Sequence, residues 1–424
     1  MPCRRLLAAL ALAAIATALF AGPAAAGARF GAFIDPVAGY EGQSKCDPTD
    51  KPGVLAFRAI VLQREPGTGA GGISRACSIG GQSEHKEGRA WDWMVSADVP
   101  AQKAAAERTI DWLKKPDSFG NDAALARRFG VMYLIFDRRI WFPGSGWRTY
   151  CVQKRAGCVE PGTRNDVRDP HTSHVHFSFT WAGAKKQTSY WHPERSYAAA
   201  LTASPNGGYW TAGVAGGVIA HDASYLGALD DKKLDHPIAA MASTPSGGGY
   251  WLTTTSGKVF AFGDAPSRGR LEHSKTRISD IASTPTGRGY WLLSRSGRVF
   301  AFGDADTHGR MEGKAAVALL PSATGLGYAL VASDGSIETF GDALAVGAGS
   351  EGADVIAAAT TPGGGYWLAT SSGRVLALGP APKLSDLAGK KPSFPVVDIA
   401  AAPDGRGYYV LLASGKVAAF GSAR

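Results

Sequence analysis

The sequence predicts an α+β domain over residues 27–190 and an all-β propeller of six blades over residues 198–424, preceded by a signal peptide of residues 1–26. The length of 424 residues fits two or three domains. Only the second half repeats itself, whereas the first half mixes helical and strand periods. The 55 Gly and 24 Pro stay below the share typical of low-complexity chains, which excludes a disordered or collagen-like protein.

The first 26 residues have the three regions of a secretory signal peptide. Arg4 and Arg5 form a basic start, residues 6–20 form an apolar run, and Ala24–Ala26 offers a cleavage site. The run is about 15 residues long, shorter than the ~20 that span a bilayer. A retained membrane anchor is the alternative. We expect a secreted protein, extracellular or cell-wall associated, with no transmembrane segment in the mature chain.

Four cysteines follow the signal peptide: Cys46, Cys77, Cys151 and Cys158. An even number in an oxidising compartment predicts two disulfides. Among the three connectivities, we favour Cys46 with Cys77 and Cys151 with Cys158, because shorter loops close at a lower entropic cost.

Positive charge is concentrated in the first half of the chain. Residues 27–195 carry 24 Lys plus Arg against 18 Asp plus Glu, and residues 196–424 carry 19 against 18. A basic exported domain suits a polyanionic partner such as a cell-wall polymer or membrane headgroups, and we expect no nucleic acid in this compartment. Ordinary solubilising charge explains the same excess.

The first half contains three segments with helical spacing and two strand-like apolar runs. The helices are predicted over residues 52–64, 100–114 and 122–129, and the strands over residues 131–136 and 174–179. The border with the second half is expected within residues 184–198, which begin with a polar segment.

The second half repeats a Gly-Tyr pair six times, with steps of 41, 40, 38, 38 and 42 residues. Each copy holds three strand-like runs and about 15 further residues, enough for a fourth strand. Four strands per unit of this length are typical of a β-propeller. The last copy ends early, so the segment 197–201 is expected to complete its blade. An open β-solenoid is the competing architecture. The repeats resemble the Gly-Tyr-Trp and Phe-Gly-Asp-Ala arrays that follow catalytic domains in secreted actinobacterial proteins.

Two features of the repeats have alternative interpretations. Asp264, Asp304 and Asp342 follow a Gly and could form a calcium ring, but Pro380 and Ser422 replace them in later copies, so we favour turn residues. The Trp of each Gly-Tyr-Trp copy could stack on sugars, but a fixed register favours packing between blades. A protein or a glycan is the expected class of propeller ligand.

Two short segments of the first half contain the candidate chemistry. His85 and Asp92 flank Gly88, which permits a tight bend that could bring the two side chains together. His174 and His176 are two residues apart in a predicted strand and therefore share one face. Two neutral imidazoles and a carboxylate are a typical ligand set for catalytic Zn²⁺, with a fourth position left for water.

These segments match a family pattern, Ser-x-His-x-x-Gly-x-Ala-x-Asp followed by His-x-His. The first half thereby resembles the zinc peptidase superfamily of D-alanyl-D-alanine carboxypeptidases, lysostaphin-type enzymes, murein endopeptidases and hedgehog domains. The resemblance covers residues 45–182 and implies a zinc peptidase fold. It also implies that His85, Asp92 and His176 are the zinc ligands.

One position departs from the carboxypeptidase pattern. These enzymes place a Glu as general base three residues before the last ligand, where this chain has Ser173. The His-x-x-His-x-His spacing is instead similar to the murein endopeptidase branch. On that resemblance His171 is the expected general base, His174 the group that stabilises the tetrahedral intermediate, and Asp169 a residue that could orient His171.

Three further residues are candidates for substrate binding. Ser83 is either a turn or N-cap residue or a substrate contact. Arg75 and Arg89 either hold a substrate carboxylate or are solvated. The expected function is that of a secreted zinc peptidase that cleaves peptide bonds in peptidoglycan stems or crosslinks, with the propeller as targeting module. The alternative is a non-catalytic zinc protein that binds the cell wall or signals.

Overall fold

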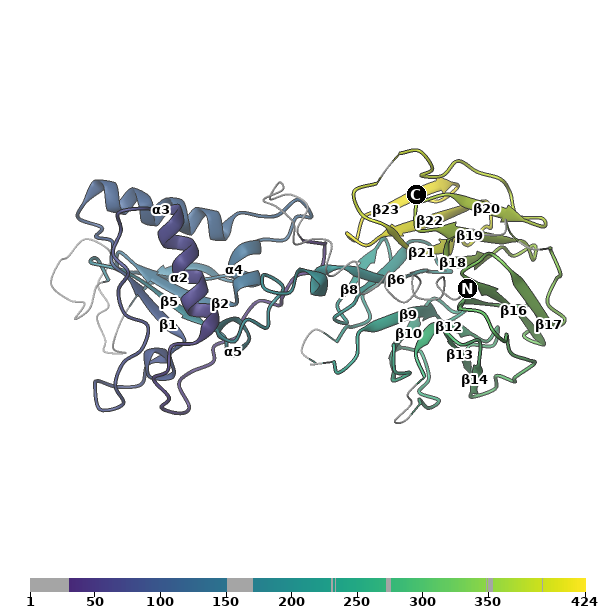
Figure 1. Ribbon diagram of the computed structural model, residues 1–424, viewed down its shortest axis with the longest axis horizontal. Coiled ribbons are helices and arrows are strands. Elements are labelled where there is room, and N and C mark those ends of the chain that lie inside the picture. Colours follow the sequence, from purple (N-terminus) through teal and green to yellow (C-terminus); the bar gives the residue numbers. More distant parts are fainter. Residues whose placement is uncertain are drawn as a thin grey trace, which may run out of the picture. The chain divides into compact units, whose positions relative to one another are not determined.

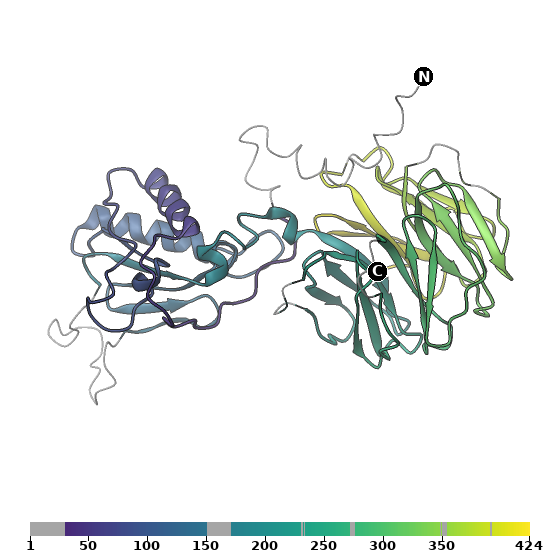
Figure 2. The same ribbon diagram turned by 60° about the horizontal axis from the view of Figure 1, so that its bottom comes forward.

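The computed structural model describes residues 30–150, 171–229, 232, 234–271, 276–347, 349, 354–390 and 392–424 (Figures 1 and 2). The chain divides into two compact units, Ile34–Arg195 and Ser196–Arg424, the second of which also includes the chain up to Phe33. The proposed signal peptide, Cys151, Cys158 and Asp169 lie outside the described residues. None of the described helices has the length and apolar character that a bilayer crossing requires.

Unit Ile34–Arg195 is a five-stranded antiparallel sheet with helices on one face (Figure 2). The strands run in the order β1-β5-β2-β3-β4. In chain order the elements are α2 (Pro52–Arg64), the 3-10 helix η1 (Glu84–Glu87), β1 (Ala90–Trp93), α3 (Pro100–Lys114), α4 (Ala124–Phe129), β2 (Val131–Phe136), β3 (Arg139–Phe142), β4 (Gly146–Thr149), β5 (Val175–Phe179), α5 (Trp181–Ala184) and the 3-10 helix η2 (Pro193–Ser196).

The core of this unit lies between the helices and one face of the sheet. Phe57 of α2 is fully buried and packs edge-on against the rings of Trp91 and Phe177. The two predicted long helices and the strand over residues 131–136 are confirmed. The third helix begins two residues later than predicted, at Ala124, because Ala123 has the left-handed φ of 50°.

The disulfide between Cys46 and Cys77 is confirmed. Its Cα atoms lie 5.9 Å apart, within the ordinary range. The bond joins the segment before α2 to the loop that leads into η1, the turn that contains His85.

The second unit consists of six three-stranded antiparallel sheets in its described residues. In blade order they are β6 (Ala198–Ala203), β7 (Tyr209–Gly213) and β8 (Val218–His221); β9 (Ile238–Ser243), β10 (Gly249–Thr254) and β11 (Val259–Gly263); β12 (Ile278–Ser283), β13 (Tyr290–Ser294) and β14 (Val299–Phe302); β15 (Ala316–Pro321), β16 (Gly327–Ala332) and β17 (Ile337–Gly341); β18 (Val355–Thr360), β19 (Tyr366–Thr370) and β20 (Val375–Leu378); β21 (Val396–Ala401), β22 (Gly407–Leu412) and β23 (Val417–Gly421).

The first strand of each sheet lies innermost, and these strands form a closed ring (Figure 1). Each inner strand contacts the inner strand of the next sheet, and β21 contacts β6. The ring identifies a propeller-like fold and excludes an open solenoid, because a solenoid leaves its first and last units apart.

Two expectations about the blades are wrong. The described residues show three strands per blade, because the segment expected to be a fourth strand runs as irregular chain whose carbonyls accept bonds from buried side chains. The segment 197–201 does not complete the last blade, since β6 pairs with β7 as the inner strand of the first blade. Each repeat is a complete sheet by itself, and the ring closes by contact between blades.

The Gly-Tyr-Trp positions join neighbouring blades, which confirms the packing interpretation. Each Trp ring packs against the Tyr ring of the next blade with centroids 5.0–6.0 Å apart, and the pairs are Trp210–Tyr250, Trp251–Tyr290, Trp291–Tyr328 and Trp367–Tyr408. Each of these Trp residues is fully buried and therefore unavailable for sugar stacking. Tyr409 of the last blade packs against Tyr209 of the first, at 4.6 Å.

The Phe-Gly-Asp residues act as turn residues. Asp264 accepts bonds from the hydroxyls of Thr244 (2.9 Å) and Ser246 (2.6 Å), and Asp304 accepts equivalent bonds from its own blade. In the last blade the roles are exchanged, since Ser422 donates to Asp404 at 2.7 Å. These carboxylates therefore stabilise a hairpin turn in the blades that carry them.

Two carboxyls on the inner ring connect neighbouring blades. Asp280 of β12 accepts the backbone N–H of Leu319 in β15 at 2.8 Å, and Asp398 of β21 accepts that of Leu201 in β6 at 2.6 Å. Burial raises the pKa of Asp280 to about 7 and that of Asp398 to about 8, although these hydrogen bonds lower both. The Asp280 carboxyl raises the pKa of Asp398 further.

We predict that the propeller loses stability as the pH rises. The folded protein keeps these two protons up to about pH 7–8, whereas the unfolded chain releases them near pH 3.8. The protonated carboxyls therefore contribute fully to the free energy of unfolding below pH 3.8, and this contribution is lost by about pH 8. Replacing both residues (Asp280→Asn, Asp398→Asn) removes the two titrating groups and should flatten this dependence. Calorimetry from pH 4.5 to 8.5 measures the pH dependence of the free energy of unfolding.

Asp404→Asn is the control, because the pKa of this exposed carboxyl is lowered and it titrates below the tested range. Parallel stability curves for the wild type and the double variant would contradict the prediction.

Candidate metal centre

The pairing of β1 with β5 places the central residues of the site. In this antiparallel pair Asp92 lies directly opposite His176, so both side chains occupy the same face of the sheet. Val175 and Phe177 point to the other face, where they are fully buried in the core beneath the helices. The site therefore lies on the sheet face opposite the helices.

The third residue comes from η1, a turn that precedes β1. The Ser83 hydroxyl caps this turn by accepting the backbone N–H of His85 at 3.3 Å. Gly88 ends it with φ 62°, and a Cβ there would lie 1.9 Å from the carbonyl oxygen of Thr49, so only glycine fits. The chain reverses at this point and brings His85 beside Asp92.

The structure brings His85, Asp92 and His176 together in a compact triangle. The Nε2 atom of His85 lies 3.1 Å from Oδ1 of Asp92 and 3.2 Å from Nδ1 of His176. The Nδ1 atom of His176 lies 2.9 Å from the same Asp92 oxygen. Among the described residues, these three form the group of side chains that could hold a metal ion together. Both histidines are buried, whereas the Asp92 side chain is 24% exposed, so the triangle is accessible on the Asp92 side.

The tautomer of His85 makes its Nε2 an electron-pair donor. Its Nδ1 lies 2.6 Å from the carbonyl oxygen of Ile73, which can only accept, so Nδ1 carries the proton. In the neutral ring Nε2 is then unprotonated and faces a carboxylate oxygen. Two facing lone pairs at this distance repel unless a proton or a metal ion lies between them.

The protonation states of the other two residues also fit a metal. Burial alone would raise the pKa of Asp92, but the neighbouring imidazoles of His176 and His85 hold it well below its usual value. Burial lowers the pKa of His176, although Asp92 opposes this. A charged carboxylate and neutral imidazoles are the forms in which these groups bind a metal ion.

The ligand spacing fits Zn²⁺. Tetrahedral bonds of 2.0–2.1 Å place neighbouring ligand atoms roughly 3.3 Å apart, close to the distances of 2.9–3.2 Å in the triangle. Three protein ligands leave the fourth position for water or substrate, as in catalytic zinc sites.

His171 and His174 lie beside the triangle. The Nε2 atom of His174 is 3.6 Å from Oδ1 of Asp92, and its Nδ1 is 3.1 Å from the hydroxyl of Ser173. The buried ring of His171 lies 4.6 Å from the His174 ring and 5.7 Å from the His176 ring. Residue His171 has φ 48°, and its carbonyl accepts the backbone N–H of Asp137, which anchors this strained residue.

The three candidate substrate contacts fare differently. Ser83 caps η1, as the turn interpretation expected. Arg75 is partly exposed beside η1, where its backbone N–H donates to the carbonyl of His85. Arg89 is neither a substrate contact nor solvated: it is fully buried, with bonds to Glu87 (2.7 Å) and to the carbonyl of Phe179 (2.9 Å). The sequence does not reveal this burial, because the partner carbonyl lies 90 residues away.

Three residues beside the site escaped the sequence analysis: Glu84, Ser178 and Tyr133. The Ser178 hydroxyl lies 2.9 Å from Nε2 of His176, and the Tyr133 hydroxyl donates to Glu84 at 2.8 Å. A signal for Ser178 existed, since it stands two residues after His176 in the same strand and therefore shares its face.

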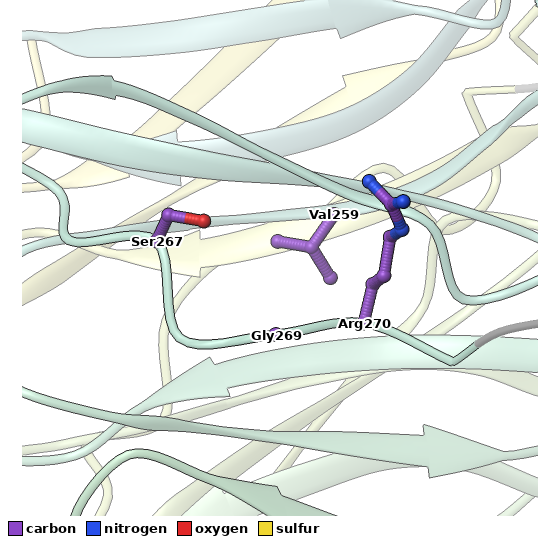
Figure 3. A pocket seen from close by; sticks show the side chains of 4 residues that line it. All are labelled: Val259, Ser267, Gly269 and Arg270. Atoms are coloured by element: carbon purple, nitrogen blue, oxygen red, sulfur yellow. The ribbon is translucent and has the colours of Figure 1, made fainter.

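A shallow depression in the propeller provides no comparable chemistry. It is lined by Val259, Ser267, Gly269 and Arg270 of the second blade (Figure 3). Its described lining residues offer one hydroxyl and one guanidinium. The triangle of His85, Asp92 and His176 is therefore the stronger candidate for a functional site.

Comparison with known proteins gives limited matches. Residues 46–166 match the family model described as VldE, C-terminal domain, which covers His85 and Asp92 and ends before His176. The match spans less than a third of the chain and names neither a zinc peptidase nor a metal. No curated protein matches the chain.

Two solved structures resemble the chain weakly. A chain of the crystal structure of the mitotic checkpoint complex has a TM-score of 0.39 and 14% identity, with 53% of this chain and 87% of that chain covered. The Cps50 (Swd1) β-propeller domain of Myceliophteria thermophila has a TM-score of 0.37 and 14% identity, with 54% and 84% covered. Both scores are too low to carry an argument, so the propeller assignment depends on the closed ring of inner strands.

We predict that the protein binds one Zn²⁺ per chain through the triangle. Each of His85→Ala, Asp92→Asn and His176→Ala should weaken zinc binding by about 100-fold or more, because two ligands cannot hold the ion as three do. Competition with a chelator of known affinity measures the change. His192→Ala is the control, an exposed histidine of the same unit, and it should bind zinc as the wild type does. Wild-type affinity in the triangle variants would rule out this site.

Proposed function

We propose that this protein is an exported zinc-dependent peptidase that hydrolyses peptide bonds in the stems or crosslinks of peptidoglycan. The observation that carries the proposal is the convergence of His85, Asp92 and His176 with two further imidazoles beside them. The sequence pattern shared with cell-wall zinc peptidases, the basic catalytic unit and the disulfide support the substrate class and the compartment.

His85, Asp92 and His176 would hold the ion, and the exposed side of Asp92 gives water and substrate access to it. Zinc bound there supplies Lewis-acid activation of a water molecule and of the scissile carbonyl. The chain's own part is to fix the ligands: the carbonyl of Ile73 orients His85, and the strand pairing holds Asp92 opposite His176.

His174 is suited to stabilise the developing oxyanion. The Ser173 hydroxyl can donate to Nδ1 of His174, which leaves the proton of the neutral ring on Nε2. That N–H faces the ligand triangle, 3.6 Å from Oδ1 of Asp92. A donor aimed at the open side of the site can stabilise negative charge on the substrate oxygen.

His171 is the proposed general base. Its ring adjoins those of His174 and His176, and an imidazole accepts and returns a proton near neutral pH. In this role it would take a proton from the attacking water and pass it to the leaving amine. The peptide bond would break without a covalent intermediate on the protein.

The propeller is proposed as the interaction module. Its closed ring presents many turns and loops on a rigid scaffold, an arrangement that often serves recognition. A wall polymer, a protein or a glycan would be its ligand, so that the propeller holds the catalytic unit near its substrate.

A second candidate is a non-catalytic zinc protein that binds the cell wall or signals. The observation that favours it is Ser173, which stands where the related carboxypeptidases have their Glu base. Among the described residues, Asp92 is the one carboxylate in the candidate metal-binding group, so no carboxylate of that group is left to act as a base. Catalysis would therefore depend on His171 and His174.

We predict that the mature protein releases new fragments from purified peptidoglycan, detected by mass spectrometry. The fragments should be absent after treatment with a chelator and with the His85→Ala variant, and their masses identify the bond. His171→Ala and His174→Ala should each lower kcat by about 100-fold or more while zinc stays bound, because they act on the proton and the oxyanion.

The His192→Ala variant controls for general effects of histidine loss in this unit. A wild-type protein that holds one zinc and releases no fragments would contradict the peptidase and favour the binding function.

A further inference from the structure

We propose that Glu84 is a buried positioning residue of the metal centre, which orients His176 through Ser178 and supplies a second negative charge for the bound ion. The inference rests on the proposed zinc site and deepens it. Neither the sequence pattern nor the family match assigns a role to this residue.

The contacts form a continuous path from Glu84 to His176. The Ser178 hydroxyl lies 2.9 Å from Nε2 of His176 and 3.5 Å from Oε2 of Glu84. The same Glu84 oxygen accepts the Tyr133 hydroxyl at 2.8 Å. The sheet register explains the arrangement, because Ser178 follows His176 by two residues in β5 and pairs with Tyr133 in β2.

The donor and acceptor roles along this path follow from the bond that His176 would make to the metal ion. If Nδ1 of His176 binds the ion, the proton of the neutral ring must be on Nε2, which then donates to Ser178. The Ser178 hydroxyl in turn donates to Glu84, since a carboxylate only accepts. Outer partners of this kind fix the ring orientation of a ligand histidine and make it a better ligand.

The negative charge of the buried Glu84 carboxylate needs a nearby cation to compensate it. Its exposed fraction is 4%, and among the described residues no basic side chain lies within ion-pair distance of its carboxyl. The other buried glutamates of this unit are paired, Glu87 with Arg89 and Glu65 with Arg108. A buried unpaired charge is costly.

The ion itself can provide that compensation. A divalent ion held by Asp92 and two neutral imidazoles leaves one positive charge in excess. Glu84 lies behind His176, one hydroxyl away, and its negative charge would neutralise the excess. The buried carboxyl and the metal therefore stabilise each other, and each is costly without the other.

The variant Glu84→Gln tests this directly, because it keeps the size and an acceptor oxygen while it removes the charge. Its zinc Kd, measured by chelator competition on the full chain, should rise about 10- to 100-fold. Its zinc-free form should melt at or above the wild-type temperature, since an unpaired buried charge is gone, and its temperature rise on zinc addition should be smaller. Ser178→Ala should also raise the Kd, because the path is broken.

The control is Glu65→Gln, a buried carboxylate of the same unit that is paired with Arg108 outside the site. It should change stability and leave the zinc Kd unchanged. If the wild type binds no zinc, the proposed function fails. If the wild type binds zinc and the zinc Kd of Glu84→Gln stays within about twofold of the wild-type value, this inference is overturned while the zinc site stands. A lower melting temperature of zinc-free Glu84→Gln as the one effect would likewise show that Glu84 is structural.

Discussion

The antiparallel pairing of β1 with β5 is the constraint on which the site depends. It sets Asp92 opposite His176 and at the same time sends Val175 and Phe177 into the core, so burial of the core fixes the register. A slip by one residue would turn the ligands toward the helices. The geometry of the candidate metal centre is thus a consequence of hydrophobic packing on the other face of the sheet.

The turn before β1 is held by a buried ion pair rather than by solvent-exposed contacts. Glu87 accepts the backbone N–H groups of Ser44 and Lys45, and it pairs with Arg89, which also bonds a carbonyl of β5. The Cys46–Cys77 disulfide restrains the same region. Removal of one partner from a buried pair is strongly destabilising, so this framework can hold three convergent electron-pair donors at one point.

The propeller follows a different principle, in which one contact is repeated around a ring. Every Trp–Tyr pair joins a blade to the next. In five blades a Tyr hydroxyl also donates to a backbone carbonyl of the segment that leads in from the preceding blade. Asp280 and Asp398 add bonds at two places on the inner ring. Neighbour contacts of this kind make the scaffold rigid and leave its loops free to vary, which suits a recognition module.

Local periodicity in the sequence was enough to predict the bounds of α2, α3 and β2, the six repeats, and the shared strand face of His174 and His176. Only the tertiary structure decided the three-stranded blades, the burial of Arg89 and the position of Glu84 behind His176. The reason is that each of these depends on contacts between residues far apart in the chain, such as Arg89 with Phe179 and Glu84 with Ser178. Periodicity records which face a residue occupies, whereas its partners across the sheet are set by how the whole chain packs.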